Sequence, residues 1–181
     1  VFRLPLISFL SDWLFAALLL IIIITAITHV LNGAVLFAGM IPTVRQATKV
    51  HMAVLLAILA VIRAGDYWLA RFDLTNETRG VVQGATYAVV NAELPALMLL
   101  ILIALLTAVL FLVTIRTDRW RFPLIASALW LVVSIGGGSV YPSLIQSLVV
   151  RPNQAERELP YIARNVEATR AAMALDSVVT E

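Results

Sequence analysis

Two charged residues interrupt an apolar stretch of this sequence and are the first candidates for chemistry. In VIRAGDYW, residues 61–68, Arg63 and Asp66 follow a run of uncharged residues, 52–62. Positions three apart share one face of a helix, so the two side chains can pair. Inside a membrane such a pair either marks a functional site or orients the helix, with the arginine reaching toward the headgroups. The sequence leaves both interpretations open.

A glycine run is the second candidate. SIGGGSVYP contains Gly136, Gly137 and Gly138, followed by Ser139. Each glycine weakens a helix by about 1 kcal/mol relative to alanine, which predicts either close helix packing or local unwinding at a binding site. We hypothesise that this segment and the Arg63–Asp66 pair line one shallow, outward-facing cavity.

Polar residues in the first apolar segment form a stripe. Thr25, His29 and Asn32 follow the spacing i, i+4, i+7, which places them on one helical face and predicts hydrogen bonds to a neighbouring helix. His29 and His51 also suggest haem ligation from two helices. We expect His51 at a helix end and His29 about two turns deeper, so a shared iron is disfavoured.

The search for enzyme motifs argues against catalysis. The sequence has no HExxH zinc motif, P-loop or GxGxxG fingerprint. A serine nucleophile at Ser139 needs a base within hydrogen-bond reach, and both histidines are expected at the far face. We therefore expect no catalytic residues, no cofactor and no metal site.

Composition places the elements that carry these residues in a membrane. Of the 181 residues, 61% are hydrophobic and 13% charged, against about 25% charged in ordinary soluble domains. A net charge of +2 is too small to indicate nucleic-acid binding. The chain has no cysteine, so it contains neither a disulfide nor a thiolate metal site.

Four segments are long enough to cross a bilayer, which takes about 20 apolar residues. Their apolar runs are continuous, so they predict helices and not barrel strands. The predicted fold is all-α: a polytopic membrane helix bundle over 1–150 and a helical soluble tail over 151–181. The spans cover about 13–37, 50–69, 95–115 and 122–141, with a surface helix in the outer loop at about 79–94.

The charge of the links predicts orientation. The first link carries Arg45 and Lys49, and the third is the arginine-rich RTDRWR, 116–121. The positive-inside rule places these links in the cytoplasm. We therefore expect a multi-pass protein of a bacterial inner (plasma) membrane, with both ends of the chain extracytoplasmic.

The tail changes character after residue 150. Asn153 with Glu156 is typical of a helix cap, and mixed charges replace the apolar runs. This indicates a soluble helical element. Its residues Tyr161, Asn165 and Arg170 are the expected contacts with a protein partner.

Several sequence blocks resemble uncharacterised protein family 0182, large membrane proteins mainly of actinobacteria. The blocks are LPLISFLSDW, DYWL, RGVVQGATY, VNAELPAL, YPSLIQ and RPNQAERELPYIARNVEATRAA. The resemblance implies about seven spans in the whole protein and a large extracytoplasmic region after the last one. This chain would supply the later spans and the start of that region. The family brings no catalytic residues.

These observations favour a non-enzymatic membrane subunit or scaffold of a cell-envelope complex. Its partners are membrane lipids and other membrane or extracytoplasmic subunits, and no nucleic acid is expected. The alternative is a transporter or channel for a lipid or small solute, using the cavity proposed above.

Overall fold

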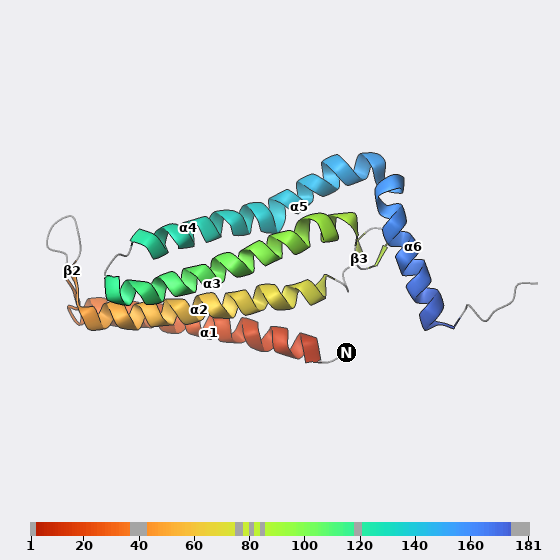
Figure 1. The fold of residues 1–181 in the computed structure, drawn as a ribbon. Helices are drawn as coiled ribbons and strands as arrows, with labels where there is room; N and C mark the ends of the chain where they lie inside the picture. Colours follow the sequence, from red (N-terminus) through yellow and green to blue (C-terminus); the bar gives the residue numbers. More distant parts are fainter. Residues whose placement is uncertain are drawn as a thin grey trace, which may run out of the picture. The chain divides into compact units, whose positions relative to one another are not determined.

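The computed structural model describes residues 3–36, 43–74, 78–79, 82–83, 86–117 and 121–174. Four helices within it are long and apolar enough to cross a membrane: Arg3–Leu31, Gln46–Asp73, Val89–Thr117 and Leu124–Asn153. The predicted all-α membrane fold is confirmed (Figure 1).

The helices and strands of the described residues have the following bounds. The α-helices are α1 (Arg3–Leu31), α2 (Gln46–Asp73), α3 (Leu94–Thr117), α4 (Arg121–Ile135), α5 (Tyr141–Leu144) and α6 (Gln154–Ala172). Wider π-helical turns are η1 (Val89–Glu93), η2 (Gly136–Val140) and η3 (Ile145–Val150), and η4 (Arg151–Asn153) is a 3-10 turn. Two antiparallel strand pairs have two residues per strand: β1 (Val35–Leu36) with β2 (Thr43–Val44), and β3 (Thr78–Arg79) with β4 (Val82–Gln83).

The first span ends earlier than the sequence predicted. It was expected over about 13–37, but α1 covers Arg3–Leu31 and residues 35–36 belong to β1. Gly33 has φ +65, and the amides of Gly33 and Ala34 bond to the carbonyls of Val30 and His29. This pattern is a Schellman motif, which closes a helix with a left-handed glycine.

The outer loop also differs from the expectation of a surface helix at about 79–94. Residues 78–79 and 82–83 form the β3–β4 pair, and a helix begins at Tyr87 and continues through η1 into α3. The fourth span, expected to stop near 141, stays helical through η2, α5 and η3 as far as Asn153. Local π-helical adjustment lets a membrane helix accommodate glycines and a proline such as Pro142.

Contacts divide the chain into two compact units. The first comprises residues 1–69 and 98–133, and the second comprises 70–97 and 134–181. The outer loop and the tail belong to the same unit, and the expected domain boundary at residue 150 stays a prediction.

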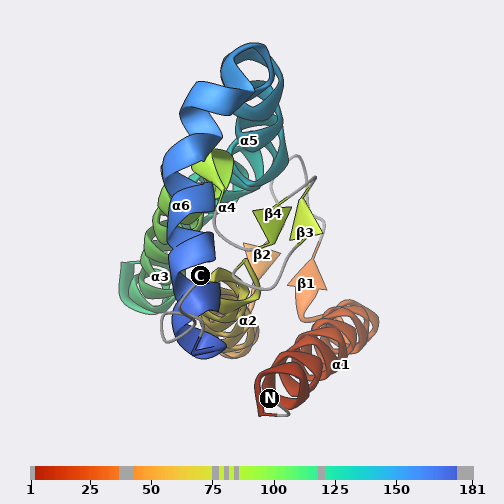
Figure 2. The same ribbon diagram turned by 90° about the vertical axis from the view of Figure 1, so that its right-hand side faces the viewer.

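A row of small residues packs the first unit. The buried residues of α2 between Gln46 and Leu69 are Thr48, Ala53, Ala57, Ala60 and Ala64. Ala57 and Ala60 form a core cluster with Ala108 and Phe111 of α3, beside which α2 lies in Figures 1 and 2. Small side chains let helix backbones approach closely, which is how membrane helices gain packing energy.

The helix α1 packs differently. None of its described residues is buried, and its leucines and isoleucines are widely exposed. These side chains suit contact with membrane lipid, so α1 must be held in place by something other than an apolar core.

The second unit is centred on η1. This turn contacts η2 and α5, and α6 packs against η3. Ala92 and Val150 are fully buried there. The chain leaves helical geometry at Asn153 (φ −126, ψ 39), and α6 starts in a new direction from η4 (Figure 1).

The packing of α2 against α3 through Ala57, Ala60, Ala108 and Phe111 can be tested by introducing a larger side chain. Ala60 is 1% exposed, so Ala60→Leu should lower the free energy of unfolding by about 1–3 kcal/mol. Its neighbour Val61 is 52% exposed, and Val61→Leu should change stability by less than about 0.5 kcal/mol. Denaturant titration of the detergent-solubilised protein measures the free energy of unfolding of both variants. An equal loss of stability in the two variants would contradict the close packing at Ala60.

Candidate functional site

The Arg63–Asp66 pair lies at a contact between α1 and α2. One Asp66 oxygen accepts a hydrogen bond from the hydroxyl of Ser11, and the other accepts one from Nη1 of Arg63 at 3.3 Å. The guanidinium carbon of Arg63 lies 3.8 Å from the ring centroid of Phe15. Two charged groups of α2 are therefore matched by a hydroxyl and an aromatic face of α1.

Burial shows how the two charges are accommodated. The Asp66 side chain is 12% exposed and that of Arg63 is 35% exposed. A buried carboxylate is tolerated when it is paired and hydrogen-bonded, and both of its oxygens are engaged here. The cation–π contact with Phe15 adds attraction for the arginine. We name Ser11, Phe15, Arg63 and Asp66 the ion-pair cluster.

A second polar cluster joins the same two helices near their other ends. Nδ1 of His29 lies 3.2 Å from the hydroxyl of Thr48, and Nε2 of His29 lies 3.3 Å from Nδ1 of His51. The two imidazole rings meet edge to face, with centroids 5.5 Å apart. We name His29, Thr48 and His51 the histidine cluster.

The histidine cluster corrects one expectation from the sequence. His29 was expected about two turns deeper than His51, but the two rings are in contact. The reason is the early end of α1 at Leu31, which brings His29 close to the end of the helix. Direct ring contact does not fit haem, whose two axial ligands lie on opposite faces of the macrocycle.

The remaining residues of the predicted stripe behave separately. Thr25 is half-buried, and Asn32 follows the last residue of α1, where its amide bonds to the carbonyl of Thr28. The stripe was predicted to form hydrogen bonds to a neighbouring helix, and its residue His29 makes such a contact with Thr48 of α2.

The two clusters have matched spacing. Ser11 and His29 are 18 positions apart (29 − 11), and so are Thr48 and Asp66 (66 − 48). At 1.5 Å per residue this is about 27 Å, close to the hydrocarbon thickness of roughly 30 Å. The clusters therefore fix the register of the antiparallel pair at two heights.

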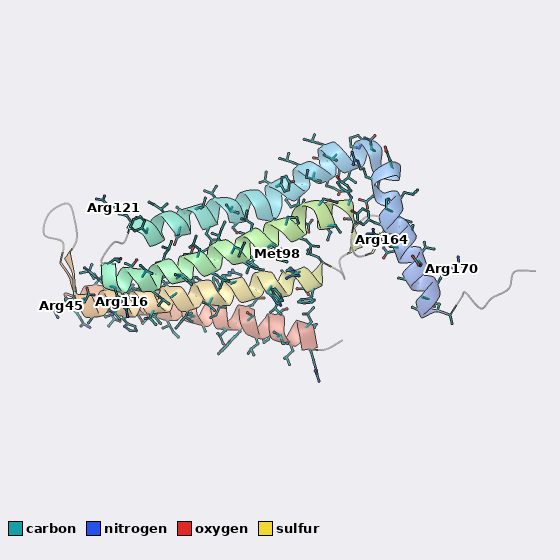
Figure 3. The ribbon with its side chains drawn as sticks, in the orientation of Figure 1. Arg45, Met98, Arg116, Arg121, Arg164 and Arg170 are labelled. Carbon is teal, nitrogen blue, oxygen red and sulfur yellow. The ribbon has the colours of Figure 1, made fainter. Side chains whose placement is uncertain are left out.

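Further polar contacts connect α2 to the rest of the first unit. Nε1 of Trp130 in α4 donates to the hydroxyl of Tyr67 at 3.2 Å, and Nε2 of Gln46 donates to the carbonyl of Ile115 in α3 at 3.1 Å. The end of the unit that contains Gln46 also carries cationic side chains, and Figure 3 labels Arg45, Arg116 and Arg121 there.

In the second unit, two side chains cap the helix that begins at Tyr87. The hydroxyl of Thr86 accepts from the amide of Val89 at 3.4 Å, and Oε2 of Glu158 in α6 accepts from the amide of Tyr87 at 3.2 Å. Thr86 and Glu158 are each 5% exposed. A carboxylate at a helix N-terminus satisfies a free amide and matches the positive end of the helix dipole.

Tyr161 extends the contact between the outer loop and the tail. Its hydroxyl accepts from Nδ2 of Asn91 at 3.1 Å, and its ring meets that of Tyr87 at 89° with centroids 6.2 Å apart. Asn165 is half-buried one turn further along α6, and Arg170 is exposed near its end (Figure 3). Contact of these three residues with a protein partner stays a prediction.

The glycine segment adopts π-helical geometry as η2 and contacts η1. A Cβ atom added at Gly136 would meet no described atom within 4 Å. The side chain of Ser139 lies outside the described residues. Since Arg63 and Asp66 belong to the first unit and η2 to the second, a cavity shared by them stays a prediction.

The sequence analysis missed Thr86 and Glu158. A threonine ahead of a long apolar run is a recognised helix-start signal, so Thr86 was available from the sequence. Glu158 was not, because its role depends on a contact with a residue 71 positions away. Glu93, which is buried on η1, was not singled out from the sequence either.

Removing one partner tests the ion-pair cluster. Asp66→Leu leaves Arg63 without its carboxylate and should lower the free energy of unfolding by about 2 kcal/mol, less than the roughly 3–5 kcal/mol for fully buried pairs. The double variant Arg63→Met with Asp66→Leu should recover most of this loss. A double-mutant cycle from denaturant unfolding measures the coupling. Exposed Asp12, next to Ser11, supplies the control Asp12→Leu, and an additive cycle would contradict the pairing.

Comparison with known proteins gives a consistent result. The model of the uncharacterised protein family UPF0182 matches residues 1–181. A UPF0182 protein of Frankia casuarinae is 41% identical over 177 residues, which is 98% of this chain and 17% of that protein. Those of Thermobifida fusca and Mycobacterium bovis are 39% and 38% identical, over 97% and 95% of this chain and 17% and 18% of theirs.

No solved structure matches. The chain spans less than a fifth of the length of these curated relatives. The match over the whole chain means that this protein belongs to the uncharacterised protein family UPF0182.

Proposed function

We propose that this chain is a non-enzymatic membrane scaffold of a cell-envelope complex, and that its outer loop and tail form a platform for a protein surface. The observation that carries the proposal is the attachment of α6 to the start of the η1–α3 helix through Glu158 and Tyr161. A buried, charge-assisted hydrogen bond gives the tail a fixed direction, which a docking surface needs.

The free side of α6 is apolar. Leu159, Ile162, Val166 and Met173 are 65%, 40%, 53% and 70% exposed. Their spacing follows one helical face, which lies beside the position of Glu158 and away from that of Tyr161. A helix that is attached through Glu158 and Tyr161 and still exposes an apolar stripe is suited to helix-in-groove binding. The relatives are more than five times longer than the matched segment. The protein surface that binds the apolar stripe of α6 can therefore belong to the rest of such a chain or to a partner subunit.

Polar groups in both units serve contacts within the chain. Asp66 is held by Ser11 and Arg63, and Glu158 caps a helix. These engagements support a structural role for the carboxylates, not one as acids or bases in a reaction.

Orientation completes the proposal. Arg45, Lys49, Arg116 and Arg121 flank the helix ends of the first and third links. The positive-inside rule puts these links in the cytoplasm. The platform and both ends of the chain are then extracytoplasmic.

Copurification with matched variants tests the platform. The protein is isolated in mild detergent and its bound proteins are identified by mass spectrometry. Ile162→Asp places a charge in the exposed stripe and should remove a bound protein or a bound extracytoplasmic region. Ala171→Asp adds the same charge on the opposite side of α6 and should leave binding unchanged, since the positions are nine residues apart. Equal recovery with both variants would contradict the proposal, and a bound solute with no protein would favour transport.

Cysteine labelling tests the orientation. The chain has no cysteine of its own. Thr117→Cys and Asn153→Cys place single thiols on the two sides of the membrane that the proposed orientation assigns to these positions. In intact cells a membrane-impermeant maleimide should label position 153 and not 117. Labelling of position 117 alone would reverse the orientation.

A further inference from the structure

We propose that His29 and His51 bind a divalent transition-metal ion that joins the ends of α1 and α2. These are the two histidines of the chain, 22 positions apart in the sequence, and they meet across the helix pair. The site is independent of the platform, because both residues belong to the first unit.

The separation of the ligand atoms fits such an ion. Nε2 of His29 and Nδ1 of His51 are 3.3 Å apart. Two imidazole nitrogens bound tetrahedrally at about 2.0–2.1 Å from zinc are themselves roughly 3.3–3.4 Å apart. The backbones of α1 and α2 therefore already hold the two rings at the distance that a shared ion requires, and only the ring orientations need to change.

Thr48 prepares His29 for this role. Its hydroxyl lies 3.2 Å from Nδ1 of His29, and the residue is 5% exposed in the first turns of α2. When this nitrogen carries the hydrogen and donates to Thr48, Nε2 keeps its lone pair for the metal. His51 then binds through Nδ1 and carries its hydrogen on Nε2.

The ligand set defines the class of ion. Imidazole suits copper, zinc and nickel, with affinity rising through the first-row series to Cu²⁺. Mg²⁺ and Ca²⁺ prefer oxygen ligands and should not bind. Among the described residues no third histidine or acidic side chain joins the pair. Water or a small anion fills the remaining positions, as at a metal centre with open coordination sites.

The location gives the ion a structural effect. His51 is exposed and His29 half-buried, within two turns of the helix ends, where water and ions reach. Because no described residue of α1 is buried, this helix depends on its two polar clusters for its position. An ion bound at one of them would tighten the α1–α2 pair and stabilise the folded state by mass action.

Zinc titration tests the site. The full chain, purified without a polyhistidine tag and treated with chelator, is titrated with Zn²⁺ in a calorimeter. One ion per chain is expected, with no binding of Mg²⁺. His29→Gln and His51→Gln should each weaken binding by at least about tenfold, and Thr48→Val by about tenfold as an outer-shell change. Thr28→Val is the matched control, because the Thr28 hydroxyl bonds to the Ile24 carbonyl of its own helix.

Copper spectroscopy identifies the ligands independently of affinity. Pulsed electron paramagnetic resonance of bound Cu²⁺ counts coordinated imidazoles through their remote nitrogens. Two are expected in the unaltered chain and one in each histidine variant whose metal-free unfolding shows that it is folded. Binding that is unchanged in both histidine variants, a single imidazole in the unaltered chain, or no Zn²⁺ binding at millimolar concentration would overturn the proposal.

Discussion

The arrangement of the first unit depends on how α1 is held in register with α2. In lipid, burying apolar side chains gives little drive for helix association, because the surrounding chains are equally apolar. Directional contacts must then choose one register from many. The ion-pair and histidine clusters do this together, since their 18-residue spacings on the two helices are equal. Sliding α1 by one turn would break both clusters and leave Asp66 with one hydrogen bond less.

The association of α2 with α3 uses another principle. Ala57, Ala60 and Ala108 allow close approach, and Phe111 fills the space beside them. This packing works through shape and van der Waals contact, so a larger side chain harms it. One face of α2 thus packs by small residues and another holds α1 by polar ones. The second unit is stabilised in another way, because Thr86 and Glu158 accept hydrogen bonds from the first amides of the helix that begins at Tyr87.

Hydropathy was sufficient to predict the four membrane helices, because lipid forces each span to satisfy its backbone internally. It could not predict where they end. The helix α1 ends where Gly33 adopts a left-handed conformation. Asn32–Gly33 is a local signal for this helix end, but the apolar residues that follow it led to a predicted span that continued to about residue 37. The pairing of Arg63 with Asp66 followed from spacing, whereas their contacts with Ser11 and Phe15 depend on register between two helices. The meeting of His29 and His51 was missed for the same reason, since an error of six residues at the end of α1 displaces His29 by about 9 Å.

The two ends of the α1–α2 pair differ in the chemistry they permit. At the ion-pair cluster, full charges neutralise each other, and altering either one exposes the other to a medium of low dielectric constant. That end is suited to a permanent contact. At the histidine cluster, two imidazole rings and a hydroxyl hold the helices, and the hydrogen of an imidazole can sit on either of its two nitrogens. His51 is also exposed, so solutes reach it. A helix without buried side chains is thus held by an ion pair at one end and by imidazole and hydroxyl contacts at the other, and the two contacts together select its register.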